Sequence, residues 1–127
     1  WDGYTAARDR LLDGIVTADV SNPVVVTGDW HASFVLDVKK TPESATIMPE
    51  FLATSMTTVN FSQDYRAANP HVRYFDGTHH GYGAVTVTPA ALRCEFKYVG
   101  DVWDAASPIE RTDAWKVAAG SHEAEPA

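Results

Sequence analysis

The residues best suited to chemistry stand together at positions 27–33, which read Thr-Gly-Asp-Trp-His-Ala-Ser and follow an apolar run. Asp29 and His31 are two positions apart, and on an extended chain such side chains point the same way. A carboxylate oxygen and an imidazole nitrogen would then aim at one point. Such mixed ligation suits iron, manganese or zinc, whereas a carboxylate alone would also suit calcium or magnesium. The segment therefore indicates a metal site; the plainer alternative is an aspartate that closes a turn beside an ordinary histidine.

The neighbours of these two residues are consistent with the metal-site hypothesis. We expect Trp30 to face the opposite side and pack. Gly28 would let the backbone turn tightly at the carboxyl end of a strand, where open α/β sheets place their ligands. Two ligands do not complete a metal site, so at least two more would have to come from elsewhere in the fold or from another chain.

A second pair of histidines, His79 and His80, follows an Asp-Gly turn signal and precedes a Gly-Tyr pair. Neighbouring side chains diverge, so we expect at most one of the two to reach a metal ion or a substrate phosphate. The alternative is the ordinary polarity of a loop.

Several other polar residues favour structural interpretations. No Gly-x-Ser-x-Gly motif surrounds Ser55, so its hydroxyl is expected to make turn hydrogen bonds rather than to act as a nucleophile. Arg73 alternates with apolar residues and is expected on the solvent face of a strand. Of the tryptophans, Trp103 and Trp115 are expected in core or docking contacts, with a weaker alternative as substrate platforms. Histidines 71 and 122 carry no functional expectation.

The candidate site needs elements that position it. Apolar residues recur at helical spacing over residues 4–15, which predicts an amphipathic helix with Asp2 at its N-cap. The valine run 24–26 is too short for a helix and apolar on both faces, which predicts a central strand covered on both sides. A helix followed directly by such a strand is the second half of a βαβ unit whose first strand lies outside this chain.

The rest of the chain reads as strands and turns. Over residues 92–99, apolar and charged residues alternate strictly, so one face is expected to be buried and the other wet. Cys94 lies on the apolar face and is expected to be a buried structural thiol. We also expect a frayed tail at 120–127. Further extended segments are predicted at 34–39, 50–54, 71–75, 82–88 and 115–117, with a short helix or loop at 62–68.

The amino-acid composition excludes several classes of protein. The 127 residues are 45% hydrophobic and carry a net charge of −7, which argues against a nonspecific nucleic-acid binder with a basic surface. No apolar run is long enough to span a membrane. A single cysteine allows no internal disulfide. The chain shows no targeting segment and opens at Trp1 as if in the middle of a longer polypeptide.

Blocks of sequence carry a family resemblance. They read Val-Val-Val-Thr-Gly-Asp-Trp-His-Ala-Ser at 24–33, Glu-Phe-Leu-Ala-Thr-Ser at 50–55, Asn-Pro-His-Val-Arg-Tyr-Phe-Asp at 69–76, and His-Gly-Tyr at 80–82. In this order, and with the opening Trp-Asp-Gly-Tyr, they resemble the carboxyl-terminal half of PhoD-like enzymes. That family contains alkaline phosphatases and phosphodiesterases, including iron-dependent bacterial phospholipases D.

The resemblance implies an α/β fold with a calcineurin-like metallophosphoesterase core, in which two sheets are sandwiched between helices (α/β/β/α). This chain would be its carboxyl-terminal part, β-rich in its second half. Residues 1–105 would belong to the catalytic domain, and residues 106–127 would form a terminal strand and tail.

The resemblance also assigns a role to Asp29 and His31. In the family, Gly-Asp-x-His supplies the last protein ligands of a multinuclear site of ferric iron and calcium. The remaining ligands, among them Asp, Asn, Tyr and a Cys, belong to an amino-terminal half, and Cys94 does not match that cysteine. Family members often carry Arg or His before the Gly-Tyr pair, which makes His80 a candidate catalytic or substrate-contact residue.

The leading hypothesis is a secreted, metal-dependent phosphoester hydrolase that acts with an amino-terminal polypeptide supplying the other ligands. Phosphodiesters such as phospholipids, glycerophosphodiesters or teichoic-acid-like polymers are slightly favoured over monoesters. The alternative is a noncatalytic β-rich binding module.

Overall fold

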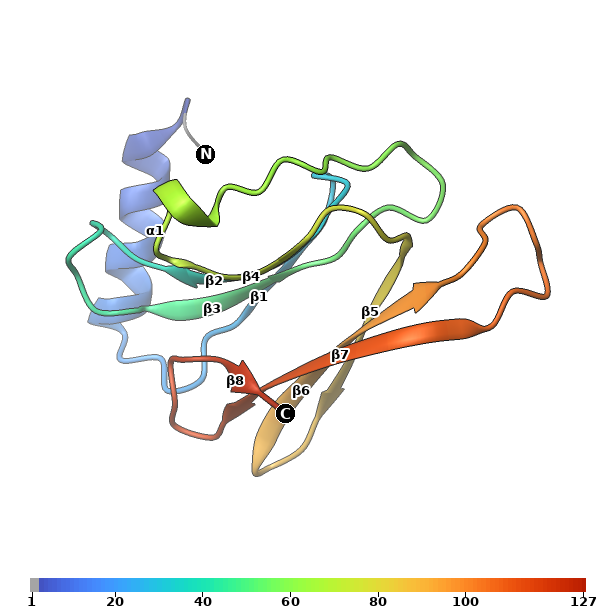
Figure 1. Cartoon of the computed structure of the whole chain (residues 1–127). Coiled ribbons are helices and arrows are strands. Elements are labelled where there is room, and N and C mark those ends of the chain that lie inside the picture. The colour runs from blue at the N-terminus through green and yellow to red at the C-terminus, as the bar shows by residue number, and fades with distance from the viewer. Residues whose placement is uncertain (1–2) are drawn as a thin grey trace.

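The computed structural model describes residues 3–127 and contains two four-stranded sheets and one long helix (Figure 1). The first sheet has the strand order β1-β3-β2-β4, and the second has the order β5-β6-β7-β8. The two-sheet α/β arrangement expected from the family resemblance is therefore confirmed. The elements are α1 (Thr5–Thr17), β1 (Val25–Thr27), β2 (Ser33–Val38), β3 (Met48–Leu52), the short 3-10 helix η1 (Arg66–Ala68), β4 (Val72–Asp76), β5 (Gly81–Val87), β6 (Ala91–Val99), β7 (Ile109–Ala118) and β8 (Glu125–Pro126).

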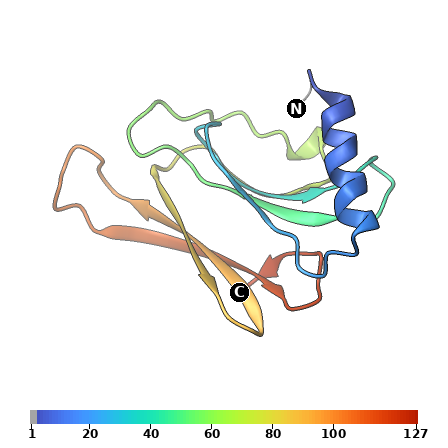
Figure 2. The ribbon, with the colours of Figure 1, turned by 180° about the vertical axis from the view of Figure 1, so that it is seen from behind.

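Helix α1 covers the face of the first sheet that points away from the second (Figure 2). Leu12 is buried against Ile47 and Met48, so the predicted helix is confirmed, but Leu11 of its apolar stripe is 46% exposed. The helix begins after Tyr4, whose side chain makes no capping hydrogen bond. Asp2, the expected N-cap, lies outside the described residues. No helix within residues 3–127 is long and apolar enough to cross a membrane.

Strand β1 is not the doubly covered central strand that its valines suggested. It pairs in parallel with β3 and lies at the end of the strand order. Val26 is consequently 60% exposed. A run of β-branched residues predicts a strand but does not fix how many neighbours the strand has.

Polar segments from three parts of the chain meet at one edge of the first sheet. Strands β1, β3 and β4 all end at this edge, and β2 begins there, because β2 runs antiparallel to both β3 and β4. Ser33 therefore lies opposite Asp76. We call this the carboxyl edge of the first sheet; it collects the 28–32 loop, the 53–62 loop and the 77–80 turn (Figure 1).

The main core fills the space between the two sheets. Val35 and Phe51 from the first sheet meet Phe96 and Trp115 from the second. The alternating pattern predicted for 92–99 is confirmed, since Cys94, Phe96 and Tyr98 are each 1% exposed.

The expected fraying of the tail is wrong. Strand β8 pairs with β7, and Ala124 is 2% exposed. The tail is further tied down by a 2.7 Å hydrogen bond from the backbone N–H of Gly120 to Asn22 Oδ1. Small, acidic composition indicated weak local preference, and tertiary packing outweighed it.

Candidate metal centre

The carboxyl edge of the first sheet carries both predicted metal ligands on the 28–32 loop. Contrary to expectation, this loop is not extended, because the φ angles of Asp29 and His31 are 76° and 57°. These values lie in the left-handed region, which side chains other than glycine adopt rarely, Asp and His more readily than most. Strand alternation therefore does not place the side chains of these two residues.

His31 is oriented by the 53–62 loop. Its Nδ1 lies 3.0 Å from the carbonyl oxygen of Val59, and its own carbonyl oxygen accepts a 3.2 Å hydrogen bond from the Phe61 backbone N–H. The Phe61 ring stacks on the imidazole, with centroids 5.5 Å apart and planes 16° apart. With Nδ1–H donating to Val59, Nε2 of the neutral ring keeps its lone pair for a ligand.

Trp30 packs, as predicted, on aromatic residues, although it remains 49% exposed. Its ring centroid lies 6.3 Å from that of Phe61 and 6.2 Å from that of Tyr65.

The exposed Asp29 carboxyl lies beside a cavity of about 590 Å³ between α1 and the first sheet, which Leu11, Val25 and other residues also line. Asp29 thus lines a groove whose walls are partly apolar and also include Arg8 and Glu50.

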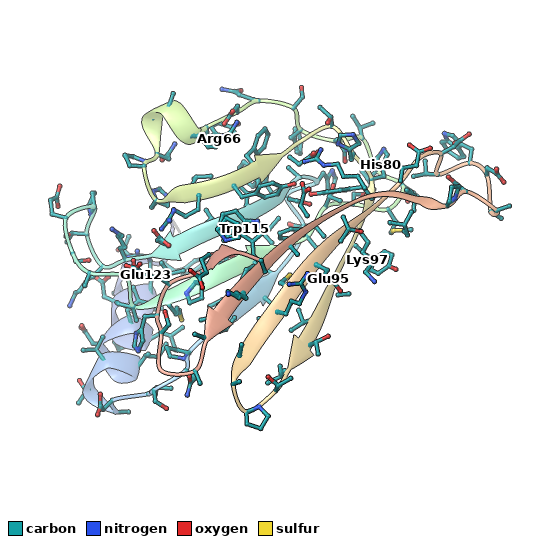
Figure 3. All side chains as sticks on the ribbon, turned by 60° about the horizontal axis from the view of Figure 1, so that its bottom comes forward. Arg66, His80, Glu95, Lys97, Trp115 and Glu123 are labelled. Atoms are coloured by element: carbon teal, nitrogen blue, oxygen red, sulfur yellow. The ribbon has the colours of Figure 1, made fainter. Side chains whose placement is uncertain are left out.

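The two adjacent histidines after β4 diverge as expected. His80 Nδ1 lies 3.1 Å from the carbonyl oxygen of Ser55, on the same 53–62 loop that orients His31. His79 Nδ1 instead lies 2.8 Å from Asp76 Oδ2. Figure 3 shows His80 near the base of the loop joining β6 and β7, where its carbonyl oxygen accepts a 3.0 Å hydrogen bond from the Val99 N–H. His31 and His80 are therefore fixed by one loop.

Several structural interpretations hold. Ser55 Oγ accepts hydrogen bonds from the backbone N–H groups of Thr57 and Thr58 at 3.2 and 2.7 Å, as a turn residue would. Burial raises the pKa of the Cys94 thiol to about 11, so it is an unreactive core group. Trp115 is buried in the core, whereas Trp103 is 87% exposed on the loop between β6 and β7.

Sequence reasoning missed the importance of Asp76, which it treated only as part of a turn signal. The carboxyl group is 7% exposed. Burial alone would raise its pKa, but hydrogen bonds from Thr78 and His79 outweigh burial and hold the pKa below its ordinary value. Arg111 Nη1 also lies 2.8 Å from Asp76 Oδ2. The one available signal was the Asp-Gly pair itself, which does not reveal a partner 35 residues away in the chain.

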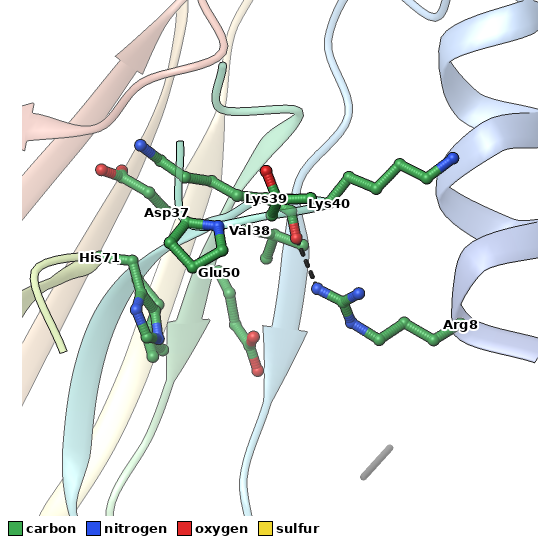
Figure 4. A pocket seen from close by; sticks show the side chains of 10 residues that line it. Arg8, Asp37, Val38, Lys39, Lys40, Glu50 and His71 are labelled. Carbon is green, nitrogen blue, oxygen red and sulfur yellow. Dashed lines mark hydrogen bonds between the residues drawn. The ribbon is translucent and has the colours of Figure 1, made fainter. Parts of the chain in front are cut away.

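A cavity of about 380 Å³ at the opposite edge of the first sheet is a weaker candidate for a ligand-binding site (Figure 4). Arg8 Nη2 donates a 2.5 Å hydrogen bond to the carbonyl oxygen of Lys39, and Lys40 Nζ pairs with Asp13 at 2.5 Å. Two of the basic side chains that line this cavity thus already interact with other groups of the same chain.

Asp29 and His31 remain candidate metal ligands, and both lie on the 28–32 loop. Within residues 3–127, no three His, Cys, Asp or Glu side chains gather as a metal-binding group. The donor chemistry nevertheless fits a mixed oxygen and nitrogen site: a solvent-facing carboxylate and an imidazole whose Nδ1 is already engaged.

Comparison with known proteins places the chain in a family. Residues 1–96 match the family model described as PhoD-like phosphatase. The chain is 34% identical over 120 residues to alkaline phosphatase D of Bacillus subtilis (strain 168), a match covering 86% of this chain and 20% of that protein. A solved structure of PhoD superposes with a TM-score of 0.83 at 26% identity, covering 99% of this chain and 26% of that one.

These matches define the chain as part of a phosphatase-type α/β fold. It belongs to the PhoD-like phosphatase family, and the resemblance seen in its sequence blocks is confirmed. The chain spans about a fifth of the length of the curated relative and about a quarter of the solved structure.

Proposed function

We propose that this chain forms the carboxyl-terminal part of a metal-dependent phosphoester hydrolase, in which Asp29 and His31 are metal ligands. The observation that carries the proposal is the fixed imidazole of His31. Metal-binding histidines commonly donate their second ring N–H to a carboxylate or a backbone carbonyl, and Val59 offers such a carbonyl at 3.0 Å.

Backbone strain at the same two residues supports the assignment. Each non-glycine residue in the left-handed region costs on the order of 1 kcal/mol or more, and such residues cluster at functional sites. Asp29 and His31 both adopt it within three positions. The chain thus accepts strain where the two side chains are needed in a fixed place.

The residues present suit iron and calcium, the metals implied by the family resemblance. When bound, such cations screen the negative charge of a phosphoester and supply the Lewis acidity for its hydrolysis. The role of Asp29 is to contribute negative charge that offsets the cations, and that of His31 is to contribute Nε2. His80, whose Nδ1 is held by Ser55, would present its other ring nitrogen to the substrate phosphate.

A partner polypeptide, the amino-terminal half of the same enzyme, would supply the missing ligands. Three observations support such a partner. Strand β1 is outermost in its sheet, and Val26 on it is 60% exposed. Leu11 of α1 is 46% exposed and lines the cavity between α1 and the first sheet. A strand added along β1 would bury these apolar side chains and use the free backbone groups of β1.

For the substrate we favour phosphodiesters of the phospholipid, glycerophosphodiester or teichoic-acid type, slightly over monoesters, and we propose a secreted enzyme. The rival proposal is a noncatalytic binding module. The observation in its favour is strand β5, most of whose residues are exposed and could contact a ligand or a protein. The Gly-Asp-x-His segment has no evident use in such a module.

Hydrolysis assays separate the two proposals. The purified protein, with any polypeptide that accompanies it, is assayed on bis-(p-nitrophenyl) phosphate and p-nitrophenyl phosphate before and after chelation. We expect chelation to abolish hydrolysis and ferric iron with calcium to restore it, with the diester cleaved faster. Hydrolysis that survives complete metal removal would refute the metal-dependent hydrolase, and a metal-free protein inactive under all conditions would favour the module.

A further inference from the structure

A buried carboxylate organises the turn beside the candidate metal centre. Asp76 Oδ1 accepts hydrogen bonds from the backbone N–H groups of Thr78 and His79, both at 3.0 Å. Asp76 Oδ2 accepts from His79 Nδ1 and from Arg111 Nη1, both at 2.8 Å. One carboxyl group thus fixes the 77–80 turn and binds an arginine.

The arginine comes from the other sheet. Arg111 lies on β7, and its guanidinium carbon is 5.3 Å from the centroid of the Tyr98 ring. Its second terminal nitrogen pairs with Asp113. Tyr74 of the first sheet donates a 2.5 Å hydrogen bond to the same Asp113 carboxylate. Arg111 therefore contacts Asp76, Asp113 and the Tyr98 ring at once.

The turn fixed by Asp76 presses against the loop that orients His31. A β-carbon added to Gly77 would lie 2.1 Å from the carbonyl oxygen of Phe61 and 2.9 Å from Ser62 Cα, so only glycine allows this approach. The turn is also linked to the 53–62 loop through Thr54 Oγ1, which donates a 3.1 Å hydrogen bond to the carbonyl oxygen of His79.

The 53–62 loop in turn contacts His31 three times, through the Val59 carbonyl, the Phe61 N–H and the Phe61 ring. A continuous set of short contacts therefore runs from Arg111 to Asp76, through the 77–80 turn, to the imidazole. Asp76 is also cross-strand partner to Ser33, two residues beyond His31, which ties the same groups together through the sheet.

We propose that Arg111, acting through Asp76, is a positioning residue for the His31 imidazole. This positioning role rests on the proposed function, in which His31 is a metal ligand. It extends that function by giving the second sheet a part in metal binding. Arg111 touches neither substrate nor metal in this proposal. Its guanidinium holds the Asp76 carboxylate, and the carboxylate holds the turn on which the 53–62 loop rests.

The test replaces Arg111 in the complete enzyme. Arg111→Met keeps the length and the apolar stem of the side chain but removes its charge. The matched control is Arg93→Met on neighbouring β6, where Arg93 pairs with Glu95 at the surface. Outer partners of metal ligands typically contribute 10-fold to 100-fold to metal affinity. We expect Arg111→Met to raise the metal concentration for half-maximal activity at least about 10-fold and to lower kcat, with KM nearly unchanged and Arg93→Met without effect.

A spectroscopic readout separates positioning from general stability. In the apo enzyme with ¹⁵N-labelled histidine, the Nδ1–H proton of His31, assigned by its loss in His31→Asn, should be protected from exchange. We expect Arg111→Met, but not Arg93→Met, to broaden or shift it. Should Arg111→Met fail to fold, Asp76→Asn, which keeps the size of the side chain but removes its charge and one acceptor oxygen, provides a second test.

A folded Arg111→Met or Asp76→Asn enzyme with unaltered metal affinity and an unaltered His31 resonance would overturn the proposal. Its failure is distinguishable from failure of the proposed function. If His31→Asn itself leaves metal content unchanged, the ligand assignment is wrong; if His31→Asn loses metal while Arg111→Met does not, only the positioning role is wrong.

Discussion

The Nδ1 atom of His31 lies 3.0 Å from the carbonyl oxygen of Val59, although 28 residues separate them in the chain. This contact selects the ring nitrogen that remains free, because the neutral imidazole has one donor and one acceptor. It also joins the loop after β1 to the loop after β3 at the carboxyl edge of the first sheet. The orientation of the His31 imidazole is thus a property of two loops rather than of the Gly-Asp-x-His motif alone.

Removing the ring that stacks on His31 should weaken metal binding without unfolding the protein. Phe61 is 54% exposed, so Phe61→Ala is expected to change the free energy of unfolding by about 1 kcal/mol or less. Its loss frees the imidazole to rotate, and we expect a several-fold lower metal affinity in a metal titration. Val59→Ala is the control, because Val59 is 81% exposed and its contact with His31 uses the backbone. Equal affinities in the two variants would contradict this prediction.

Gly77 should tolerate no side chain. In Gly77→Ala the new β-carbon would overlap the Phe61 carbonyl oxygen at 2.1 Å, which forces the turn and the loop apart. We expect a loss of about 1 to 3 kcal/mol in the free energy of unfolding, measured by urea denaturation. For comparison, a β-carbon at Gly83 would lie 3.5 Å from Ala53 Cβ, an ordinary contact. Gly83→Ala should therefore be nearly neutral, and similar losses in both variants would argue against the close approach.

The Asp76 carboxylate should make stability depend on pH. Its pKa is lowered in the folded protein, so its contribution is present above the ordinary value of 3.8 and is lost as the pH falls through the folded pKa. We expect Asp76→Asn to lower the free energy of unfolding at pH 7 by about 1 to 3 kcal/mol. The difference from wild type should shrink as the pH falls below 3.8 and through the lowered pKa of the folded state, where the wild-type carboxyl group also becomes neutral. A difference that stays constant between pH 7 and acid conditions would exclude this charge effect.

The Cys94 thiol should be inert in the folded protein. It is 1% exposed, and burial raises its pKa to about 11, so almost none is thiolate at pH 8. Ellman's reagent should label Cys94 rapidly in the denatured protein. In the native protein, any slow labelling should occur only at the rate at which the core between the sheets opens. Rapid labelling of Cys94 under native conditions, located by peptide mass spectrometry, would show that this core is open.

Local patterns predicted those elements whose physical cause is local. The helical spacing of α1 predicted the helix and the burial of Leu12, although Leu11 is exposed, and the strict alternation of β6 predicted both the strand and its buried face. The same reasoning failed for Val26, because exposure of a strand depends on its neighbours. It failed at Asp29 and His31 too, because the alternation rule holds for an extended chain and the backbone of both residues is left-handed.

Within the candidate site, sequence patterns identified the donor types but not what holds them. Val59 contributes a backbone atom, which every residue possesses, so no pattern could single it out. Asp76 and Arg111 meet only because β4 and β7 belong to sheets that pack face to face. Such contacts follow from the tertiary fold.

Elemental analysis of the complete enzyme tests the central claim most directly. Asp29→Asn replaces the charged carboxylate by a neutral amide and His31→Asn removes the imidazole, and asparagine tolerates the left-handed backbone of both positions. Asp19→Asn is the matched control, since Asp19 also has a positive φ of 51° but follows α1, away from the carboxyl edge. We predict that both site variants lose at least one metal ion per enzyme while the control retains the wild-type content. Site variants that fold and keep the full metal content would contradict the assignment of Asp29 and His31 as ligands.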